Sequence, residues 1–188
     1  MVMNVYDFDN TIYDGDSSLE FYIYCMKKKP WLIFCFPFQV VGFCFFKFGF
    51  IRKVHFKEIF FCFLRFISSP EKLVSSFWNE NICKIKKWYK EKQKSNDVVV
   101  SASPAFLICP ICSQIGIKYV LASEVDIHTG KFYTENCYGE EKVNRFQKCF
   151  GCVIIEEFYS DSLSDVYMAK LAKKSFLVDG NNISVWRI

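Results

Sequence analysis

Two acidic residues directly follow a short apolar run at the start of the chain. The run Val-Met-Asn-Val-Tyr at residues 2–6 leads into Asp7, Phe8, Asp9, Asn10 and Thr11. A short apolar run bounded by polar residues is typical of a buried parallel strand, and α/β folds place reactive groups at the carboxyl ends of such strands. We therefore expect the functional site where Asp7 and Asp9 emerge.

These acids would need a cation to act on an anionic substrate. Two carboxylates one residue apart repel each other strongly in a desolvated cleft, so both stay ionised only if a cation shares the site. Mg²⁺ is the natural candidate, because it takes oxygen ligands, usually one or two carboxylates plus waters and substrate phosphate. The competing interpretation is a simple strand exit whose side chains cap the next turn.

Further polar side chains follow other predicted strands. Ser101 lies in a β-branched run at residues 97–104 and could bind a phosphate oxygen, or merely cap the helix that follows. Lys142 falls near a helix start, where an exposed ion-pairing role is the alternative. Asp161 ends a strand at residues 153–161, and Asp165 follows four residues later, so the pair could hold a cation from one side.

Composition limits the class of protein. A chain of 188 residues can form one sizeable core and a smaller second unit, and 52% apolar with 23% charged residues excludes a disordered chain. No secretory signal peptide precedes the first strand, so we expect a cytoplasmic protein, with the inner face of a membrane as a further option. The ten Cys are then expected to be reduced thiols rather than disulfides.

Charge divides the chain into a basic insert and an acidic remainder. Residues 12–95 contain 15 Lys or Arg and 7 Asp or Glu, a formal charge of +8, and the other residues carry −4. A basic module inserted into an acidic one is the most informative feature of the composition.

The patterns also predict the other elements. We expect a helix at residues 19–26, capped by Asp16 or Ser17 and ended by Pro30, and an amphipathic helix at residues 55–68. Further predictions are a helix opening at Pro70, a basic helix at 78–94, a helix at 105–115, a strand at 119–123, a hairpin at 124–134, a helix reaching residue 150 and a strand at 175–180.

Residues 31–51 are nearly all apolar, and three interpretations stay open. Their length suits a membrane span, but Pro37, Gln39, Gly42 and Lys47 interrupt them and positive charge flanks both ends. We favour an interfacial helix or helical hairpin that enters one leaflet beside anionic lipid. A Phe-rich core of a small cap and a true transmembrane span are the alternatives.

Two other patterns suggest different chemistry. Cys109 with Cys112, and Cys149 with Cys152, have the Cys-x-x-Cys spacing of zinc or redox sites, although a buried Cys usually behaves as a small apolar residue. Nucleic-acid binding is disfavoured, because the lysines interleave with Phe rather than with stacking aromatics in a polar groove. A catalytically idle binding protein is also possible, although every chemical position is filled.

The order of these motifs resembles the haloacid dehalogenase superfamily of phosphatases. Ser-Ala-Ser-Pro at 101–104, Gly139 before Lys142, and Asp161 with Asp165 are similar to its phosphoserine-phosphatase-like branch. The basic, Phe-rich insert and the residues around Tyr138 and Tyr159 are similar to C-type phosphatidylglycerophosphatases.

This resemblance implies a fold and a domain arrangement. The fold would be an α/β, Rossmann-like three-layer sandwich with a central, mostly parallel sheet and a helical cap inserted after the first strand. Residues 1–15 and 95–188 would form the core and residues 16–94 the cap. The partner would be a phosphate-ester substrate, with an anionic membrane surface as a possible second partner through the cap; the oligomeric state stays open.

The resemblance also implies roles for individual residues. Asp7 would attack phosphorus and Asp9 would act as acid and base, while Mg²⁺ would be held by Asp7, the Asp9 carbonyl and Asp161. Asp165 would orient Lys142 or a metal-bound water. The phosphate oxygens would be held by Asn10, Thr11, Ser101, Ala102 and Lys142.

Three positions depart from the family pattern. Asn10 replaces the commonest Gly, which is tolerable because Asn accepts left-handed geometry. Ser160 replaces a frequent Gly, and we expect a mild effect. Asp16 stands where phosphoserine-specific members have a Glu that reads the substrate amine. This departure weakens phosphoserine as the substrate. The resemblance to phosphatidylglycerophosphatases implies a lipid phosphate such as phosphatidylglycerophosphate as one substrate, and a small phosphoserine-like metabolite is the alternative.

Overall fold

The computed structural model of the protein describes residues 2–188. A six-stranded sheet lies at its centre, with strand order β3-β2-β1-β4-β5-β6. The first five strands are parallel, and β6 pairs antiparallel with β5. The strands are β1 Val2–Tyr6, β2 Val98–Pro104, β3 Tyr119–Ser123, β4 Ile154–Ser160, β5 Ala172–Asp179 and β6 Asn182–Val185.

Helices cover both faces of the sheet, as the predicted three-layer sandwich requires. The helices are α1 Ser17–Lys28, α2 Phe36–Lys47, α3 Lys53–Phe60, α4 Pro70–Asn81, α5 Lys87–Lys92, α6 Ala105–Gln114, α7 Glu140–Phe150 and α8 Val166–Ala169. Short 3-10 helices join them: η1 Pro30–Cys35, η2 Phe61–Phe66, η3 Ile82–Lys84 and η4 Leu163–Asp165. The predicted fold class is confirmed.

The side chains of each strand alternate between the two faces of the sheet, and each face has its own apolar core. Tyr6 and Val99 pack with α6 and the helices inserted after β1, whereas Val5 and Val100 pack with α7 and α8 on the opposite face. Successive side chains of a strand point to opposite faces, so a strand buried on both faces reads as a continuous apolar run. This is why the parallel strands could be recognised in the sequence.

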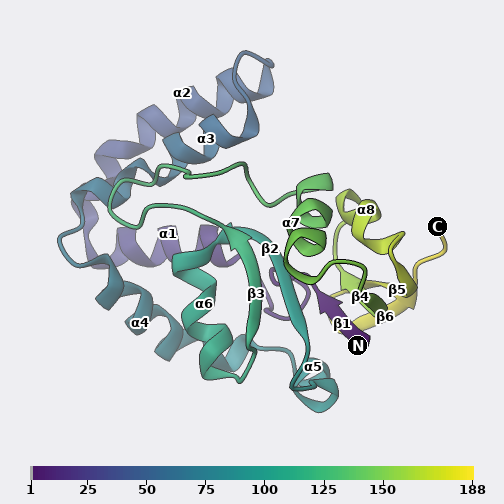
Figure 1. Cartoon of the computed structure of the whole chain (residues 1–188). Coiled ribbons are helices and arrows are strands. Elements are labelled where there is room, and N and C mark those ends of the chain that lie inside the picture. The colour runs from purple at the N-terminus through teal and green to yellow at the C-terminus, as the bar shows by residue number, and fades with distance from the viewer. Residues whose placement is uncertain (1) are drawn as a thin grey trace.

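The regular elements between β1 and β2 are all helices and run from α1 to α5. In Figure 1, α2 and α3 lie side by side and project away from the sheet. The arrangement matches the expected helical insert, whose boundaries at residues 15/16 and 94/95 stay a prediction.

The apolar segment forms one arm of a helical hairpin. Pro30–Lys47, which comprises η1 and α2, is the one helical segment among residues 2–188 that has the length and composition to cross a membrane. Only Gln39 and Gly42 of α2 are buried. The buried Phe-rich core expected as an alternative therefore lies elsewhere, at Phe61 and Phe63 of η2.

Two of the predicted helices are wrong in extent. The helix expected at 78–94 is interrupted because Ile85 pairs with Tyr13 and the N–H of Lys86 donates to the carbonyl of Ile12. The helix expected at 55–68 begins at Lys53 and changes to 3-10 geometry after residue 60. In the first case a contact with the strand-exit loop outweighs local helix propensity.

Candidate active site

Asp7 lies at the carboxyl end of β1, beside the end of β4. Its N–H donates to the carbonyl of Tyr159 at 2.8 Å, which continues the pairing of the two strands beyond Tyr6. The residue is only 7% exposed. Its Oδ1 accepts a hydrogen bond from Lys142, and Oδ2 has no hydrogen-bond partner among residues 2–188. One oxygen of this carboxylate is therefore fixed and the other is available.

A buried lysine joins the two ends of the site. Lys142, in the first turn of α7, is 2% exposed, and its Nζ lies 2.7 Å from Asp7 Oδ1 and 2.6 Å from Asp165 Oδ2. Ser160 donates from its hydroxyl to the same Asp165 oxygen at 2.7 Å. The alternative of an exposed, ion-pairing Lys142 is therefore wrong.

Asp9 is held from two sides. The N–H of Ser17, at the start of α1, donates to Asp9 Oδ1 at 2.7 Å. The hydroxyl of Ser103, at the end of β2, donates to Asp9 Oδ2. The carboxylate of Asp9 is thus bound to both the first cap helix and the second strand.

The loop after β1 connects Asp161 to the same region. Asn10 has a φ of 53°, the only positive φ outside Gly among residues 2–188, which agrees with the left-handed geometry expected there. Thr11 accepts a hydrogen bond from the N–H of Asp161 at 2.9 Å, and the Asn10 side chain acts to lower the pKa of the Asp161 carboxyl. Asp161 therefore lies against the loop that carries Asp9.

Backbone hydrogen bonds hold the loop around Asn10. The N–H of Asn10 donates to the carbonyl of Gly15 at 2.9 Å, and phosphate binding by N–H groups near Asn10 stays a prediction. The carbonyl of Asn10 accepts a hydrogen bond from the ammonium group of Lys86. Asn10 and Thr11 therefore hold the loop in shape.

The end of β2 meets a lysine from the cap. Ser101 is 1% exposed, and its hydroxyl accepts a hydrogen bond from the N–H of Ser103 at 3.0 Å. The Ala102 carbonyl accepts from Lys57 Nζ of α3 at 2.7 Å, and the same Nζ lies 2.9 Å from Asn136 Oδ1. Lys57 thus joins the insert to the sheet close to the carboxylates.

Burial dominates the electrostatics of the acids. It raises the pKa of Asp7 to about 7, although the nearby Lys142 opposes this rise. It raises the pKa of Asp9 to about 6 against the hydrogen bonds from Ser103 and Ser17. Burial alone would lower the pKa of Lys142, but Asp7 and Asp165 raise it well above its ordinary value, so the lysine stays protonated.

The donor set fits a hard divalent cation. Four carboxylates gather here, those of Asp7, Asp9, Asp161 and Asp165, and Lys142 is the one cation bonded directly to any of them within residues 2–188. Desolvation also raises the pKa of Asp161, although its side chain is exposed in part. The described residues contain no cluster of three His, Cys, Asp or Glu side chains that could hold a metal. Mg²⁺ needs fewer, because carbonyl oxygen, water and substrate complete its shell.

A small pocket lies between the start of α1 and helix α3. Its volume is about 230 Å³, and it is lined by Asp16, Ser18, Leu19, Phe56, Lys57, Phe60 and Phe61. The predicted substrate residue Asp16 does line this pocket, and its carboxylate also accepts from the N–H of Leu19 as the cap of α1. The pocket is apolar apart from one lysine, the acid and a serine.

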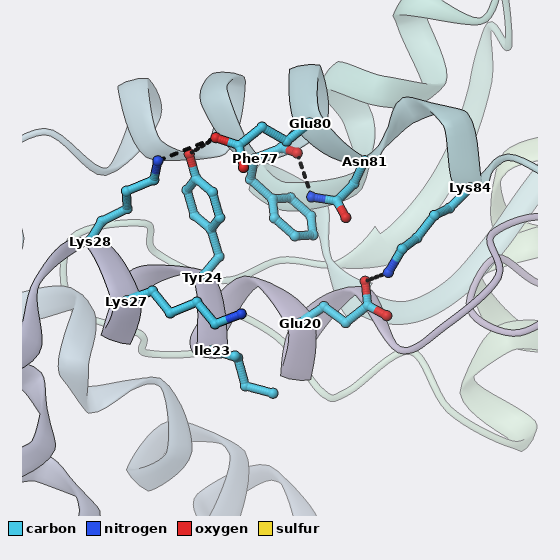
Figure 2. Close-up of a pocket in the computed structure, with 9 residues that line it drawn as sticks. All are labelled: Glu20, Ile23, Tyr24, Lys27, Lys28, Phe77, Glu80, Asn81 and Lys84. Atoms are coloured by element: carbon cyan, nitrogen blue, oxygen red, sulfur yellow. Dashed lines mark hydrogen bonds and ion pairs between the residues drawn. The ribbon is translucent and has the colours of Figure 1, made fainter.

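A different pocket lies between α1 and α4. It has a volume of about 500 Å³, and Figure 2 shows it bordered by ion pairs of Lys28 with Glu80 (3.3 Å) and Lys84 with Glu20 (2.8 Å). None of the predicted site residues lines it. Four of its five charged side chains form these two ion pairs, and it lies apart from the predicted site residues.

Sequence reasoning missed four residues of the site. Ser17, Ser103 and Ser160 each hold a carboxylate, and Lys57 reaches the site from the cap. The period of two that makes Ser101 and Ser103 share one side of β2 could have identified Ser103. No sequence signal marked Lys57, because its role depends on how the insert folds back. The thiols of the two Cys-x-x-Cys pairs are all free, and only Cys112 among them is buried.

The sequence matches one family profile. The profile, that of the haloacid dehalogenase-like hydrolases, matches residues 5–170, which include every predicted site residue. No curated protein matches the sequence.

Solved structures share the fold. A protein of unknown function from Bordetella pertussis Tohama I is 16% identical, with a TM-score of 0.76 over 93% of this chain and 88% of its own. A phosphoserine phosphohydrolase-like protein from Francisella tularensis subsp. tularensis SCHU S4 is 19% identical, with a TM-score of 0.57 over 93% and 86%. A probable phosphoserine phosphatase from Vibrio cholerae is 11% identical, with a TM-score of 0.62 over 93% and 55%.

Proposed function

Because this chain belongs to the haloacid dehalogenase-like hydrolase family, we propose that it is a phosphatase that hydrolyses phosphate monoesters through a phosphorylated Asp7. The observation that supports this most directly is the state of the Asp7 carboxylate, which is buried with Oδ1 on Lys142 and Oδ2 free. A carboxylate fixed by one oxygen presents the other in a defined direction, which favours in-line attack.

The reaction has two displacements. Asp7 Oδ2 attacks phosphorus, the bond from phosphorus to the ester oxygen breaks, and Asp9 gives its proton to the leaving alcohol. Asp9 then takes a proton from water, whose oxygen attacks phosphorus and releases the Asp7 carboxylate and inorganic phosphate. A pKa of about 6 suits Asp9 for both proton transfers near neutral pH.

The remaining residues hold charge and geometry. Lys142 offers positive charge to the non-bridging oxygens, and Ser101 offers a hydroxyl from the end of β2. Asp165 and Ser160 position Lys142 through the hydrogen bonds described above. The Asp7 carboxylate, the Asp9 carbonyl and the Asp161 carboxylate would hold Mg²⁺, which would supply charge neutralisation between nucleophile and phosphate.

We propose a lipid phosphate, such as phosphatidylglycerophosphate, as the substrate, presented at the inner face of an anionic membrane. Three observations support this: the mostly apolar pocket lined by Asp16 and Lys57, the exposed apolar side chains of α2, and the basic charge of the insert. A small metabolite resembling phosphoserine is the alternative. Asp16, shorter than the Glu of phosphoserine-specific members, makes it the weaker of the two.

The test is hydrolysis of a chromogenic phosphate ester with added Mg²⁺. We expect turnover by the wild-type protein, loss of turnover on chelation of divalent cations with recovery on adding Mg²⁺, and at least a thousandfold loss in Asp7→Asn. Asp14→Asn, an exposed acid in the same loop, is the matched control and should stay active. Retained hydrolysis in Asp7→Asn would refute the assignment of the nucleophile.

The substrate class needs a second comparison. Rates on phosphatidylglycerophosphate in mixed micelles are compared with rates on phosphoserine and simple sugar phosphates. A higher kcat/KM for the lipid, dependent on its surface concentration in the micelle, is expected. Preference for phosphoserine would select the alternative.

A further inference from the structure

A large apolar groove lies on the far side of α3 from the substrate pocket. It has a volume of about 1060 Å³ and runs between η1 with α2 on one side and α3 with η2 on the other. This is roughly the upper end of the 300–1,000 Å³ range of small-molecule sites. Trp31, Phe34, Phe38, Val41, Ile59 and Cys62 contribute to its wall.

Helix α3 separates the groove from the reaction site. Phe56, Lys57 and Phe60 of this helix line the small pocket that contains Asp16, whereas His55 and Ile59 line the groove, and none of the predicted site residues lines the groove. The two lining sets share no residue. A molecule in the groove is therefore not positioned for attack by Asp7, and the groove is a site of its own.

Exposed apolar side chains surround the opening of the groove. Phe34 is 77% exposed, Phe38 70% and Phe48 76%, and most other large side chains of η1 and α2 are also exposed. Soluble monomers rarely leave so many neighbouring apolar groups uncovered. An apolar partner is therefore expected to cover this surface.

The charges around the groove select the partner. Between residues 21 and 57 there is no Asp or Glu but there are seven Lys or Arg. Arg65 and Lys131 line the groove and take part in no ion pair among residues 2–188. The one acid in its wall, Glu58, accepts a hydrogen bond from the N–H of Phe132 at 3.0 Å. The rim therefore offers unpaired cations above an apolar interior.

We propose that this groove binds one acyl chain of an anionic membrane phospholipid, whose phosphate lies between Arg65 and Lys131. The lipid is a resident of the bilayer and is not the molecule hydrolysed. A second copy of this chain fits less well, because it would bring two basic surfaces together. The proposal rests on the membrane association proposed above but not on the chemistry at Asp7.

The first experiment locates the acyl chain. The full chain is mixed with phosphatidylcholine vesicles that contain phosphatidylglycerol with a photoreactive diazirine on its acyl chain, and the crosslinked residues are mapped after illumination. Occupation of the groove predicts crosslinks at Ile59 and Cys62, which line its interior and are only partly exposed. Shallow insertion of the hairpin tip predicts crosslinks only at Phe48 and Phe50, and that result would overturn the proposal.

The second experiment tests the headgroup contact. The double variant Arg65→Gln/Lys131→Gln should lower crosslinking at Ile59 and Cys62 at least tenfold under subsaturating lipid, since each cation near an anionic surface contributes several-fold to affinity. The control Lys148→Gln/Lys170→Gln removes two exposed lysines of the core and should crosslink like the wild type. Equal crosslinking by the phosphatidylcholine analogue of the probe would contradict a role for the negative headgroup.

Two further measurements separate this proposal from the proposed function. Asp7→Asn should crosslink as the wild type does, and the groove variants should hydrolyse a soluble chromogenic ester at the wild-type rate. Absent crosslinks with intact hydrolysis overturn the groove alone. Absent hydrolysis with intact crosslinks overturns the phosphatase alone. Sedimentation that shows a dimer without lipid, together with absent crosslinks, would assign the surface to a second copy.

Discussion

At the level of single residues, Lys142 keeps two buried carboxylates together. Its Nζ lies within 2.7 Å of both Asp7 and Asp165, and all three side chains are nearly inaccessible. Removal of one partner from a buried ion cluster leaves uncompensated charge, which costs more than the net value of the pair. We therefore expect the lysine to contribute to stability as well as to the proposed chemistry.

The variant Lys142→Met tests this dependence. We expect a loss of about 3–5 kcal/mol in the free energy of unfolding and at least a hundredfold loss in kcat. Adding Asp165→Asn should recover part of the stability but none of the activity, because one unpaired charge is removed while the phosphate contact stays lost. Denaturant unfolding and steady-state kinetics measure the two effects. A Lys142→Met protein as stable as the wild type would contradict this account.

A second buried acid gives a pH-dependent prediction. Asp97 is 1% exposed, its Oδ1 has no partner, and burial raises its pKa to about 6. A raised pKa means that the folded state binds the proton more tightly. The stabilisation of the folded state by this proton is complete below the pKa of Asp97 in the unfolded chain, near 4. It is lost as pH rises through the folded-state pKa of about 6.

Asp97→Asn should remove this loss. The Asn side-chain oxygen can still accept from the N–H of Lys94, which lies 2.8 Å from Asp97 Oδ2. We expect the variant to be more stable than the wild type by about 1–3 kcal/mol at pH 7.5 and nearly equal to it at about pH 4. Thermal melts across this pH range provide the measurement. If the wild type instead became more stable relative to Asp97→Asn as pH rises, the predicted sign would be wrong.

The sequence revealed the site residues whose position follows from a local pattern. It did not reveal those whose role depends on a partner brought close by the fold. Asp7, Asp9 and Asp161 follow strands, so the pattern of apolar runs located them. Lys142 was found by its resemblance to a family motif, and the residues alone left an exposed role open. Replacement of the frequent Gly by Ser160 was expected to have a mild effect. The Ser160 hydroxyl donates to Asp165, and this bond was not foreseen because it crosses a turn that no periodicity describes.

At the level of elements, the loop between β3 and α7 ties the sheet to the inserted helices. The carbonyl of Thr129 accepts from Arg65 Nε at 3.3 Å, and Glu135 pairs with Arg52 at 2.9 Å. Gly130 has a φ of 73°, and a β-carbon there would lie 2.5 Å from the carbonyl oxygen of Phe61. The close approach of loop and η2 thus requires glycine.

Gly130→Ala should loosen this connection. We expect a destabilisation of about 2 kcal/mol or more, from left-handed strain together with displacement of the loop. Gly49→Ala is the matched control, since its φ is 78° with nothing near the added carbon, and should cost only about 1 kcal/mol. Unfolding free energies of the two variants give the difference. Equal losses would mean that the contact with Phe61 contributes nothing.

Elements were predictable where one pattern dominated. Strands β1, β2, β4 and β5 read as buried apolar runs, and α6 was recognised as an apolar helix. Strand β6 was missed, because its four residues are all exposed and carry no alternation towards a core. The helix expected across residues 78–94 failed for a tertiary reason, since residues 85–86 bond to the loop after β1.

At the level of the whole molecule, charge and apolar surface coincide on the insert. This arrangement predicts binding to anionic vesicles that weakens with salt but does not vanish. Raising the ionic strength from about 0.05 to about 0.5 M shortens the Debye length severalfold and should lower affinity for phosphatidylglycerol vesicles about tenfold or more. Vesicle sedimentation measures it, with pure phosphatidylcholine vesicles as the control. Binding indifferent to both salt and lipid charge would contradict an electrostatic contribution.

One missing side chain fixes how far apart α2 and α3 stand. A β-carbon on Gly42 would lie 2.7 Å from Ile59, so the two helix axes approach as closely as they do because position 42 carries only hydrogen. Both residues also line the groove. The width of the groove therefore depends on the absence of a side chain at position 42. Ala at this position would push α2 and α3 apart and widen the groove, and no charged group would change.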